Sequence, residues 1–196
     1  MKADQAVKIL KTFKWDILPS IFGCAHNSII GFLSTMWIDQ SKDNSVLDGA
    51  PSPITGGRRV GQKNADILLC KSDKPFIVVE VETNVSKYQD KLKSIQDYLH
   101  NSITYAGLEF GLMVVTNLCK GDMKYKHNWN VIKKEVEEGQ DNVALVSIEK
   151  TKALLDESVL GKLRSRNDYY PWQIVNIDYW VHDESGVIRE GNLMTG

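Results

Sequence analysis

Two short apolar runs joined by a polar turn constrain the fold of this chain more than any other feature. The runs Ala65–Cys70 and Phe76–Thr83 are rich in Ile, Leu and Val, and the polar stretch KSDK separates them just before Pro75. Apolar runs of this length with a short polar connection are typical of β-strands that pair through a tight turn. The sequence therefore predicts an antiparallel β-hairpin over residues 65–83.

The period of the apolar residues changes directly after this hairpin. They recur at helical spacing to about residue 100, which predicts an amphipathic helix; they are Val85, Tyr88, Leu92, Ile95 and Leu99. The run FGLMVVTNL at residues 110–118 is then apolar at almost every position, as in a strand that is covered on both faces. A hairpin, a helix and a buried central strand in this order indicate an α/β fold.

The rest of the chain extends this alternation. Further helices are predicted at residues 3–13, 27–40, 122–138 and 151–163, and further strands at 143–148 and 172–181. Residues 41–61 are rich in Ser, Asp, Asn, Pro and Gly, which predicts a loop with room for a short hairpin. At 196 residues and 42% hydrophobic, the chain suits one globular domain. We expect a mixed central β-sheet flanked by helices.

Three carboxylates interrupt the predicted hairpin, namely Asp66, Glu80 and Glu82. Side chains alternate between the faces of a strand, so Glu80 and Glu82 share a face with Phe76 and Val78. Two interpretations are open. The glutamates could lie on the solvent face of an edge strand, or they could converge with Asp66 around a divalent cation, which relieves their mutual repulsion. Because that face begins apolar and turns acidic only at its end, we favour the cation site.

The spacing of these acids is similar to that of a known family. Asp66, thirteen intervening residues and then Glu80-Val81-Glu82, followed by a helix and a buried strand, resemble the core of PD-(D/E)xK nucleases. The resemblance covers about residues 27–118 and implies a restriction-endonuclease-like core, with residues 119–196 as a C-terminal elaboration. Two positions depart from the motif, since Ala65 stands in place of the Pro and Glu82 in place of the Lys.

The resemblance implies a divalent-metal-dependent endonuclease that hydrolyses DNA. In it Asp66 and Glu80 would bind Mg²⁺, for which Mn²⁺ should substitute, and Glu82 would bind metal or accept a proton from the attacking water. A Glu-x-Glu version occurs in BamHI-like restriction enzymes, to which the stretch EVETNVSK is similar. A type II restriction endonuclease is therefore the expected function, with 5′-phosphate products. The alternative is a non-catalytic module that binds nucleic acid or protein.

The missing lysine of the motif has two candidate replacements on the following helix. Lys87 and Lys91 lie just beyond the strand end and could point back to the acids, although a solvated helix flank is the interpretation we favour for both. A further acid from an upstream helix belongs to the BamHI-like pattern. No glutamate precedes Glu80, so Asp39 is the best-placed candidate, against the simpler interpretation of a charge at a helix end.

Basic residues predict where a nucleic acid would bind. Lys and Arg outnumber Asp and Glu by 18 to 13 through Lys134, and the balance reverses to 6 against 12 after it. The loop GGRRVGQK offers cations suited to phosphate oxygens, and the segment 120–134 interleaves lysines with Tyr125 and Trp129, which could stack on bases. The candidate contacts are Arg58, Arg59, Lys63, Lys87, Lys91, Lys124 and Lys126, with Lys120, Lys133 and Lys134 in the same basic segment.

The remaining sequence signals concern compartment and partners. Three cysteines without a Cys-x-x-Cys pair suit buried thiols in a reducing cytoplasm. No stretch is apolar enough for a membrane span. The expected partner is DNA. A homodimer is compatible with the sequence. The four histidines share no metal-ligand spacing and are interpreted as surface or hydrogen-bonded residues.

Overall fold

A seven-stranded mixed β-sheet forms the centre of the molecule. The computed structural model describes residues 1–18, 25–49, 54–55, 58–59, 64–100, 104–105, 107–117, 122–152 and 172–194. The strand order is β1-β4-β5-β6-β7-β8-β9, in which β5, β6 and β7 are parallel and the other pairs antiparallel. The strands are β1 (Asn44–Asp48), β4 (Ile67–Lys71), β5 (Lys74–Glu82), β6 (Phe110–Asn117), β7 (Val143–Lys152), β8 (Trp172–His182) and β9 (Ile188–Asn192). The expected mixed α/β sheet is confirmed.

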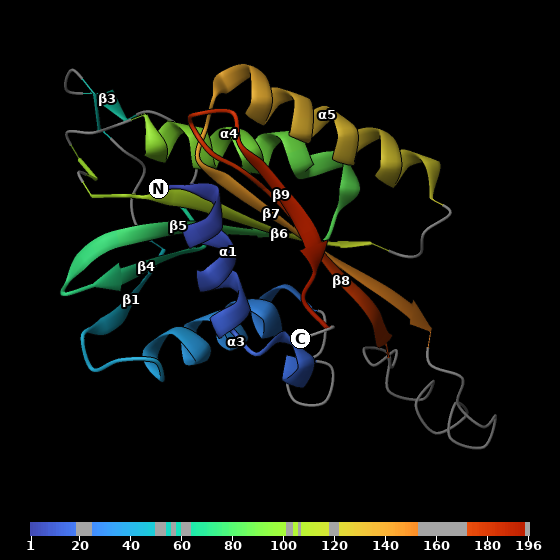
Figure 1. The fold of residues 1–196 in the computed structure, drawn as a ribbon, viewed down its shortest axis with the longest axis horizontal. Coiled ribbons are helices and arrows are strands. Elements are labelled where there is room, and N and C mark those ends of the chain that lie inside the picture. The colour runs from blue at the N-terminus through green and yellow to red at the C-terminus, as the bar shows by residue number, and fades with distance from the viewer. Residues whose placement is uncertain are drawn as a thin grey trace.

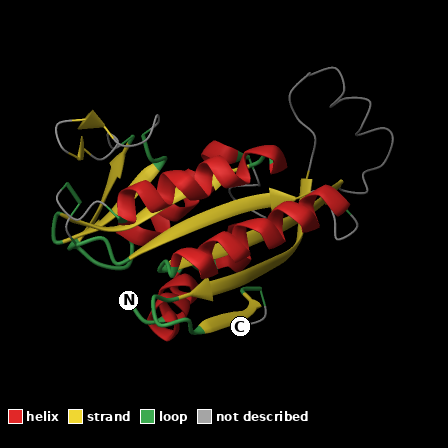
Figure 2. Ribbon diagram, turned by 90° about the horizontal axis from the view of Figure 1, so that it is seen from above, coloured by secondary structure: helices red, strands yellow, loops and turns green. Residues whose placement is uncertain are grey.

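Helices cover both faces of the sheet (Figure 1). One face carries α1 (Ala3–Thr12) and α3 (His26–Ile38), and the other carries α4 (Tyr88–Leu99) and α5 (Met123–Gly139). Seen from above, the helices of this second layer lie over the sheet and run in roughly the same direction as its long strands (Figure 2). Short 3₁₀ turns, η1 (Trp15–Ile17) and η2 (Val85–Lys87), follow α1 and precede α4. Each helical layer covers its own apolar core, so the sheet is buried from both sides.

The β4–β5 hairpin has the predicted position and direction. Its turn residues Ser72 and Asp73 have φ values of 49° and 60°, and such left-handed pairs fit the twist of a tight hairpin. Ile67 pairs with Val79, which brings Asp66 to the level of Glu80 at the start of β4. The central position of β6 also follows the prediction, and β6 pairs in parallel with β5.

The structure departs from the sequence predictions at residues 41–61, 151–152 and 188–192. Residues 41–61 contain not only a short hairpin, β2 (Ile54–Thr55) with β3 (Arg58–Arg59), but also β1, which pairs with β4 and forms one edge of the sheet. The polar strand β9 at the other edge was not predicted. The predicted helix at 151–163 is wrong at its start, because β7 runs through Lys152, and residues 153–163 lie outside the described part. Among the described helices, none has the length and apolar character needed to span a membrane.

At Gly111 on β6, α4 packs closely against the sheet. A Cβ atom at position 111 would lie 2.1 Å from Cγ2 of Ile95 and 3.6 Å from Cδ1 of Leu99. Since Ile95 is fully buried and β-branched, it has little room to move away. We expect Gly111→Ala to lower the free energy of unfolding by about 1–3 kcal/mol, as overpacking does. Urea denaturation would measure it.

Gly31 provides the matched control for that experiment. It lies within α3, and a Cβ atom there meets nothing within 4 Å. Gly31→Ala should therefore leave the protein as stable as before or stabilise it by up to about 1 kcal/mol through helix propensity. Equal effects of the two substitutions would contradict the close contact between α4 and β6.

Asp183 joins the first turn of α1 to the β8–β9 turn. Its Oδ2 accepts the N–H of Ala3 at 2.9 Å, and its Oδ1 accepts bonds from Ser185 and Val187. Burial acts to raise the pKa of this carboxyl, but the hydrogen bonds from Ser185, Ala3 and Val187 outweigh it and lower the pKa to about 2. Only the ionised carboxylate accepts all of these bonds, so its contribution to stability is present above the ordinary pKa of 3.8 and is lost as the pH falls towards 2.

The variant Asp183→Asn tests this linkage. At neutral pH we expect it to be less stable than the wild type by about 1–3 kcal/mol, the usual value of hydrogen bonds to a charged group. The difference should shrink as the pH is lowered from 4 towards 2, because the wild-type carboxylate is then protonated. Thermal unfolding of both proteins across this range would show it. A difference that stays constant with pH would contradict the assignment.

Candidate active site

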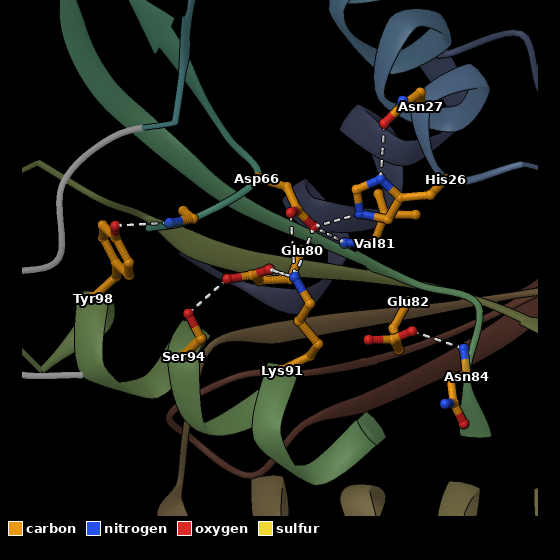
Figure 3. A network of polar contacts seen from close by, with 11 residues as sticks. His26, Asn27, Asp66, Glu80, Val81, Glu82, Asn84, Lys91, Ser94 and Tyr98 are labelled. Carbon is orange, nitrogen blue, oxygen red and sulfur yellow. Dashed lines mark hydrogen bonds and ion pairs between the residues drawn. The ribbon is translucent and has the colours of Figure 1, made fainter. Parts of the chain in front are cut away.

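Asp66, Glu80 and Lys91 form a compact charged cluster between β5 and α4 (Figure 3). The ammonium Nζ of Lys91 lies 2.5 Å from Oε2 of Glu80, and 3.2 and 3.1 Å from Oδ1 and Oδ2 of Asp66. Ser94 donates its hydroxyl to the other oxygen of Glu80, Oε1, at 2.6 Å. Two carboxylates from the hairpin and one lysine from the following helix therefore meet at one point.

Regular secondary structure places each member of the cluster. Alternation along β5 points Val78 and Glu80 towards α4, while Val79 and Val81 enter the core beneath α1 and α3. On α4, a row at helical spacing faces the hairpin, because Lys91 and Ser94 contact the acids and the hydroxyl of Tyr98 accepts the N–H of Ala65 at 2.9 Å. The register of the β4–β5 hairpin places the remaining member of the cluster, Asp66, beside Glu80.

Burial makes the charges of the cluster strongly interdependent. The side chain of Glu80 is 1% exposed, whereas those of Asp66 and Lys91 are 14% and 18% exposed. Burial, together with the charge of Asp66, raises the pKa of Glu80 to about 7 in spite of Lys91. Burial opposes ionisation of Asp66 too, but the N–H of Val81, at 2.7 Å, and the ammonium of Lys91 hold its pKa below the ordinary value. Near neutral pH, Asp66 is ionised and Glu80 readily holds a proton.

Lys91 remains charged in this environment. Burial acts to lower the pKa of its ammonium, but the two carboxylates outweigh burial and raise it. The cluster accordingly combines one persistent cation, one persistent anion and one carboxyl that exchanges a proton near neutrality. Such perturbed groups gather at functional sites more often than elsewhere, although structural ion pairs produce them as well.

His26 joins the cluster from the first turn of α3. Its Nε2 lies 3.3 Å from Oδ2 of Asp66, its Nδ1 lies 3.1 Å from Oδ1 of Asn27, and its side chain is 38% exposed. The sequence interpretation of His26 as a surface or hydrogen-bonded residue did not foresee this neighbour. No spacing in the sequence indicates it, because Asp66 is forty residues away and only the packing of α3 on the sheet brings the two together.

Glu82 lies on the same face of β5 as Glu80 but outside the Lys91 cluster. Its Oε1 accepts the N–H of Asn84 at 2.7 Å, and the residue is 8% exposed. Since Glu80 and Glu82 are both buried and β5 is an inner strand between β4 and β6, the solvent-face interpretation of these glutamates is wrong. The metal-binding or proton-accepting role expected of Glu82 stays a prediction.

Lys91 lies elsewhere than expected, whereas Asp39 is the exposed charge at a helix end that the simpler interpretation predicted. Lys91 is not on a solvated helix flank, as we favoured from the sequence, but is paired with both acids, while Lys87 is exposed as expected. Asp39 does not join the acids. It is exposed at the end of α3 opposite to His26, and thirteen helical residues separate the two by about 20 Å.

The predicted nucleic-acid contacts are only partly described. Arg58 and Arg59 form β3 through their backbone, and Lys63 and Lys120 lie outside the described residues. Lys124 and Lys126 are exposed on the first turns of α5. The aromatic residues between the lysines pack against other rings, since Tyr125 lies edge-on to Tyr88 and stacks on Trp129, with ring centroids 5.9 Å apart for the second pair.

The donor atoms of the cluster suit a hard divalent cation. Asp66 and Glu80 direct oxygens at one common point, and carboxylate oxygens are the ligands that Mg²⁺ and Mn²⁺ prefer. Within the described residues, no group of three or more His, Cys, Asp or Glu side chains is arranged to hold a metal. The residues thus offer two protein ligands, a number typical of Mg²⁺ sites that retain water and bind substrate phosphate.

Comparison with known proteins does not assign the chain to a family. No protein-family model, curated protein or solved structure matches it. Its function therefore has to be inferred from the chemistry of the cluster.

Proposed function

We propose that this protein is a divalent-metal-dependent endonuclease of the PD-(D/E)xK type that hydrolyses DNA, with Asp66, Glu80 and Lys91 as its central residues. The contact of Lys91 with both carboxylates supports this most strongly. The motif needs two acids and an ammonium in one place. Glu82 occupies the lysine position of the motif, and Lys91 supplies an ammonium to the acids from the next helix.

Asp66 and Glu80 would hold Mg²⁺ at this site. The bound ion would polarise the scissile phosphate and lower the pKa of a bound water. Val81 fixes the Asp66 carboxylate through its backbone N–H, and Ser94 fixes the Glu80 carboxylate through its hydroxyl, so both ligands are oriented in advance. The Lys91 ammonium would stabilise negative charge on the phosphate, and Glu82 is the further acid available to bind metal or take a proton.

A type II restriction endonuclease is the specific activity we favour. The Glu-x-Glu stretch and the order of hairpin, helix and parallel strand support this choice, which rests on the family resemblance and on the arrangement of β4, β5, α4 and β6. Products with 5′-phosphate ends and action as a homodimer on DNA belong to the same proposal.

The second candidate is a non-catalytic binding module on the same fold. One observation favours it, namely that Lys91 already pairs with both acids, so the cluster can serve as a structural ion-pair network without any metal. A buried charge network of this kind can hold a helix against a sheet and has no need of substrate.

Titration with Mn²⁺ separates the two candidates. The nuclease requires that the wild-type protein bind Mn²⁺ and that Asp66→Asn and Glu80→Gln each weaken the binding, whereas a structural ion pair requires neither. Electron paramagnetic resonance of free Mn²⁺ would measure the affinity. Asp39→Asn is the control, because Asp39 is an exposed acid on α3 remote from the cluster. Unchanged affinity in both cluster variants would contradict the nuclease.

A rim of exposed lysines beside the cluster is the expected DNA contact. We call Lys87, Lys124 and Lys126 the basic rim. Asn128 on α5 donates a hydrogen bond to the carbonyl of Val85 in η2 at 3.2 Å, which places the start of α5 against the turn that carries Lys87. Lysines clustered near a phosphodiesterase site suit the phosphate backbone, which is contacted without regard to sequence.

Removal of two rim lysines should weaken DNA binding in a salt-dependent manner. In the double variant Lys87→Ala/Lys124→Ala, the slope of log affinity against log salt should become shallower by roughly two units, about one for each lost phosphate contact. Lys11→Ala is the control, because that exposed lysine lies on α1, on the opposite face of the sheet from α4 and α5. Arg58→Ala and Arg59→Ala test the hairpin β2–β3 in the same assay. An unchanged slope in the double variant would exclude the basic rim as a backbone contact.

A further inference from the structure

Every oxygen of the two central carboxylates has a hydrogen-bond donor in this structure. Glu80 receives Ser94 at Oε1 and Lys91 at Oε2, while Asp66 receives Lys91 at Oδ1 and both Val81 and Lys91 at Oδ2. Among these donors, Lys91 is shared by the two acids. Its ammonium therefore occupies the gap between them, where a cation that binds both acids would have to lie (Figure 3).

A divalent ion and this ammonium cannot share the gap. Mg²⁺ approaches carboxylate oxygens to about 2.0–2.1 Å. Lys91 Nζ lies 2.5 Å from one oxygen of Glu80 and 3.1 Å from one of Asp66, so an ion bridging the same oxygens would lie within a few ångströms of a second cation. Repulsion between cations at that separation is strong in a partly buried site. Binding of the metal to both acids requires the ammonium to withdraw.

We propose that Lys91 is the resident counter-ion of the metal-free site, and that a divalent metal displaces its ammonium, which thereby becomes available to the scissile phosphate. This inference rests on the proposed function and specifies how that site is controlled. Before the metal binds, Lys91 holds the two acids together. When the metal binds, the ammonium exchanges the acids for the phosphate. The two binding events therefore occur in a fixed order: the metal binds the acids first, and Lys91 contacts the phosphate second.

The mobility of the three groups supports this order. Asp66 is anchored by the backbone N–H of Val81, and Glu80 is 1% exposed and held by Ser94, so neither carboxylate is well placed to move. Lys91 carries its charge on a flexible four-carbon stem, and its side chain retains 18% exposure to solvent. The ammonium is the member of the cluster that can leave without disturbing the backbone.

A pair of lysine variants tests the competition through metal affinity. Lys91→Met keeps the aliphatic stem and removes the ammonium, and we expect it to bind Mn²⁺ at least about tenfold more tightly than the wild type, or about 1.4 kcal/mol. Lys93→Met removes the same charge from an exposed position on the same helix and should change the affinity by less than about threefold, since exposed charges interact weakly in water. Lys91→Met binding with unchanged or weaker affinity would overturn the proposal.

A second measurement uses the wild-type protein and does not depend on the folding of a variant. Acetylation of lysines by acetic anhydride, read by mass spectrometry, should proceed slowly at Lys91 without metal and several-fold faster with saturating Mg²⁺, while Lys93 reacts equally in both conditions. A Lys91 rate that Mg²⁺ leaves unchanged or slows would overturn the displacement.

The two experiments distinguish failure of this inference from failure of the proposed function. Wild-type binding of Mn²⁺ that depends on Asp66, combined with Lys91→Met binding no tighter, would leave the metal-dependent nuclease standing and reject the displacement. An absence of Mn²⁺ binding in the wild type and in Lys91→Met alike would reject both.

Discussion

Replacing Glu80 with glutamine is expected to reduce DNA cleavage by about a thousandfold or more, equivalent to about 4 kcal/mol of transition-state stabilisation. Glutamine has nearly the same shape, so the substitution removes the charge that would bind Mg²⁺ and little else. Asp66→Asn should have an effect of the same order. Rates of hydrolysis of an end-labelled duplex in Mg²⁺ would measure both.

Folding should survive these two substitutions. The cluster has two acids for one lysine, and an amide at position 80 can turn its oxygen to the Lys91 ammonium and donate its NH₂ to the Ser94 hydroxyl, which can also accept. We therefore expect thermal unfolding within a few degrees of the wild type, consistent with about 1 kcal/mol or less in a small domain. Glu138→Gln, at an exposed glutamate on α5, is the control and should cleave normally. Normal cleavage by Glu80→Gln would contradict the role assigned to it.

Glu82→Lys is expected to eliminate cleavage, although it would introduce the lysine of the PD-(D/E)xK motif on which the proposed function draws. Glu82 is 8% exposed and shares a strand face with Glu80, so a lysine there would place a second ammonium close to Lys91 and the incoming metal. Like charges repel strongly at short range in a buried site. Because Lys91 already supplies an ammonium to the acids, a second one has no evident use. Cleavage rates and Mn²⁺ affinity should both fall.

Glu82→Gln separates the charge of this residue from its structural contact. Glutamine can still accept the N–H of Asn84, so a loss of activity would report the missing charge rather than a disturbed strand end. Near wild-type cleavage by Glu82→Lys, with unchanged Mn²⁺ affinity, would show that Glu82 neither binds metal nor takes a proton.

The sequence predicts best those helices and strands in which the spacing of the apolar residues reflects which sides are buried. The helix over 88–99 repeats its apolar residues along one stripe, and β6 is apolar on both faces because helices cover both sides of it. The strands β1 and β9 were missed for the converse reason. Both lie at edges of the sheet, and their sequences NSVLD and IREGN are largely polar, so neither shows the burial pattern that marks an inner strand.

The acids of the candidate site were predictable, but the lysine was not settled by the sequence. Alternation and hairpin register suffice to bring Asp66 and Glu80 together, since both are local properties. The position of Lys91 depends on how α4 is rotated against β5. That rotation is fixed by the whole buried stripe of the helix and by the close contact at Gly111. A polar row at 91, 94 and 98 beside the apolar stripe was the available signal.

Asp39 and His26, at opposite ends of α3, also show that the sequence does not predict how a helix packs on the sheet. Helical spacing predicts α3 but does not say which of its ends approaches the hairpin. The structure brings the His26 end to Asp66 and leaves Asp39 exposed about 20 Å away. Packing between distant segments decides this choice, and no local pattern encodes it.

Hydrolysis of supercoiled plasmid DNA by the purified protein tests the central claim most directly. The wild type should convert the plasmid to nicked or linear DNA in Mg²⁺ or Mn²⁺ and leave it intact in EDTA, and Glu80→Gln prepared in parallel should leave it intact in every condition. The substrate should be a mixture of plasmids with different sequences, so that many potential recognition sites are present. Cleavage of equal rate by wild type and Glu80→Gln, or an intact plasmid with folded wild type in both metals, would contradict a nuclease centred on Asp66, Glu80 and Lys91.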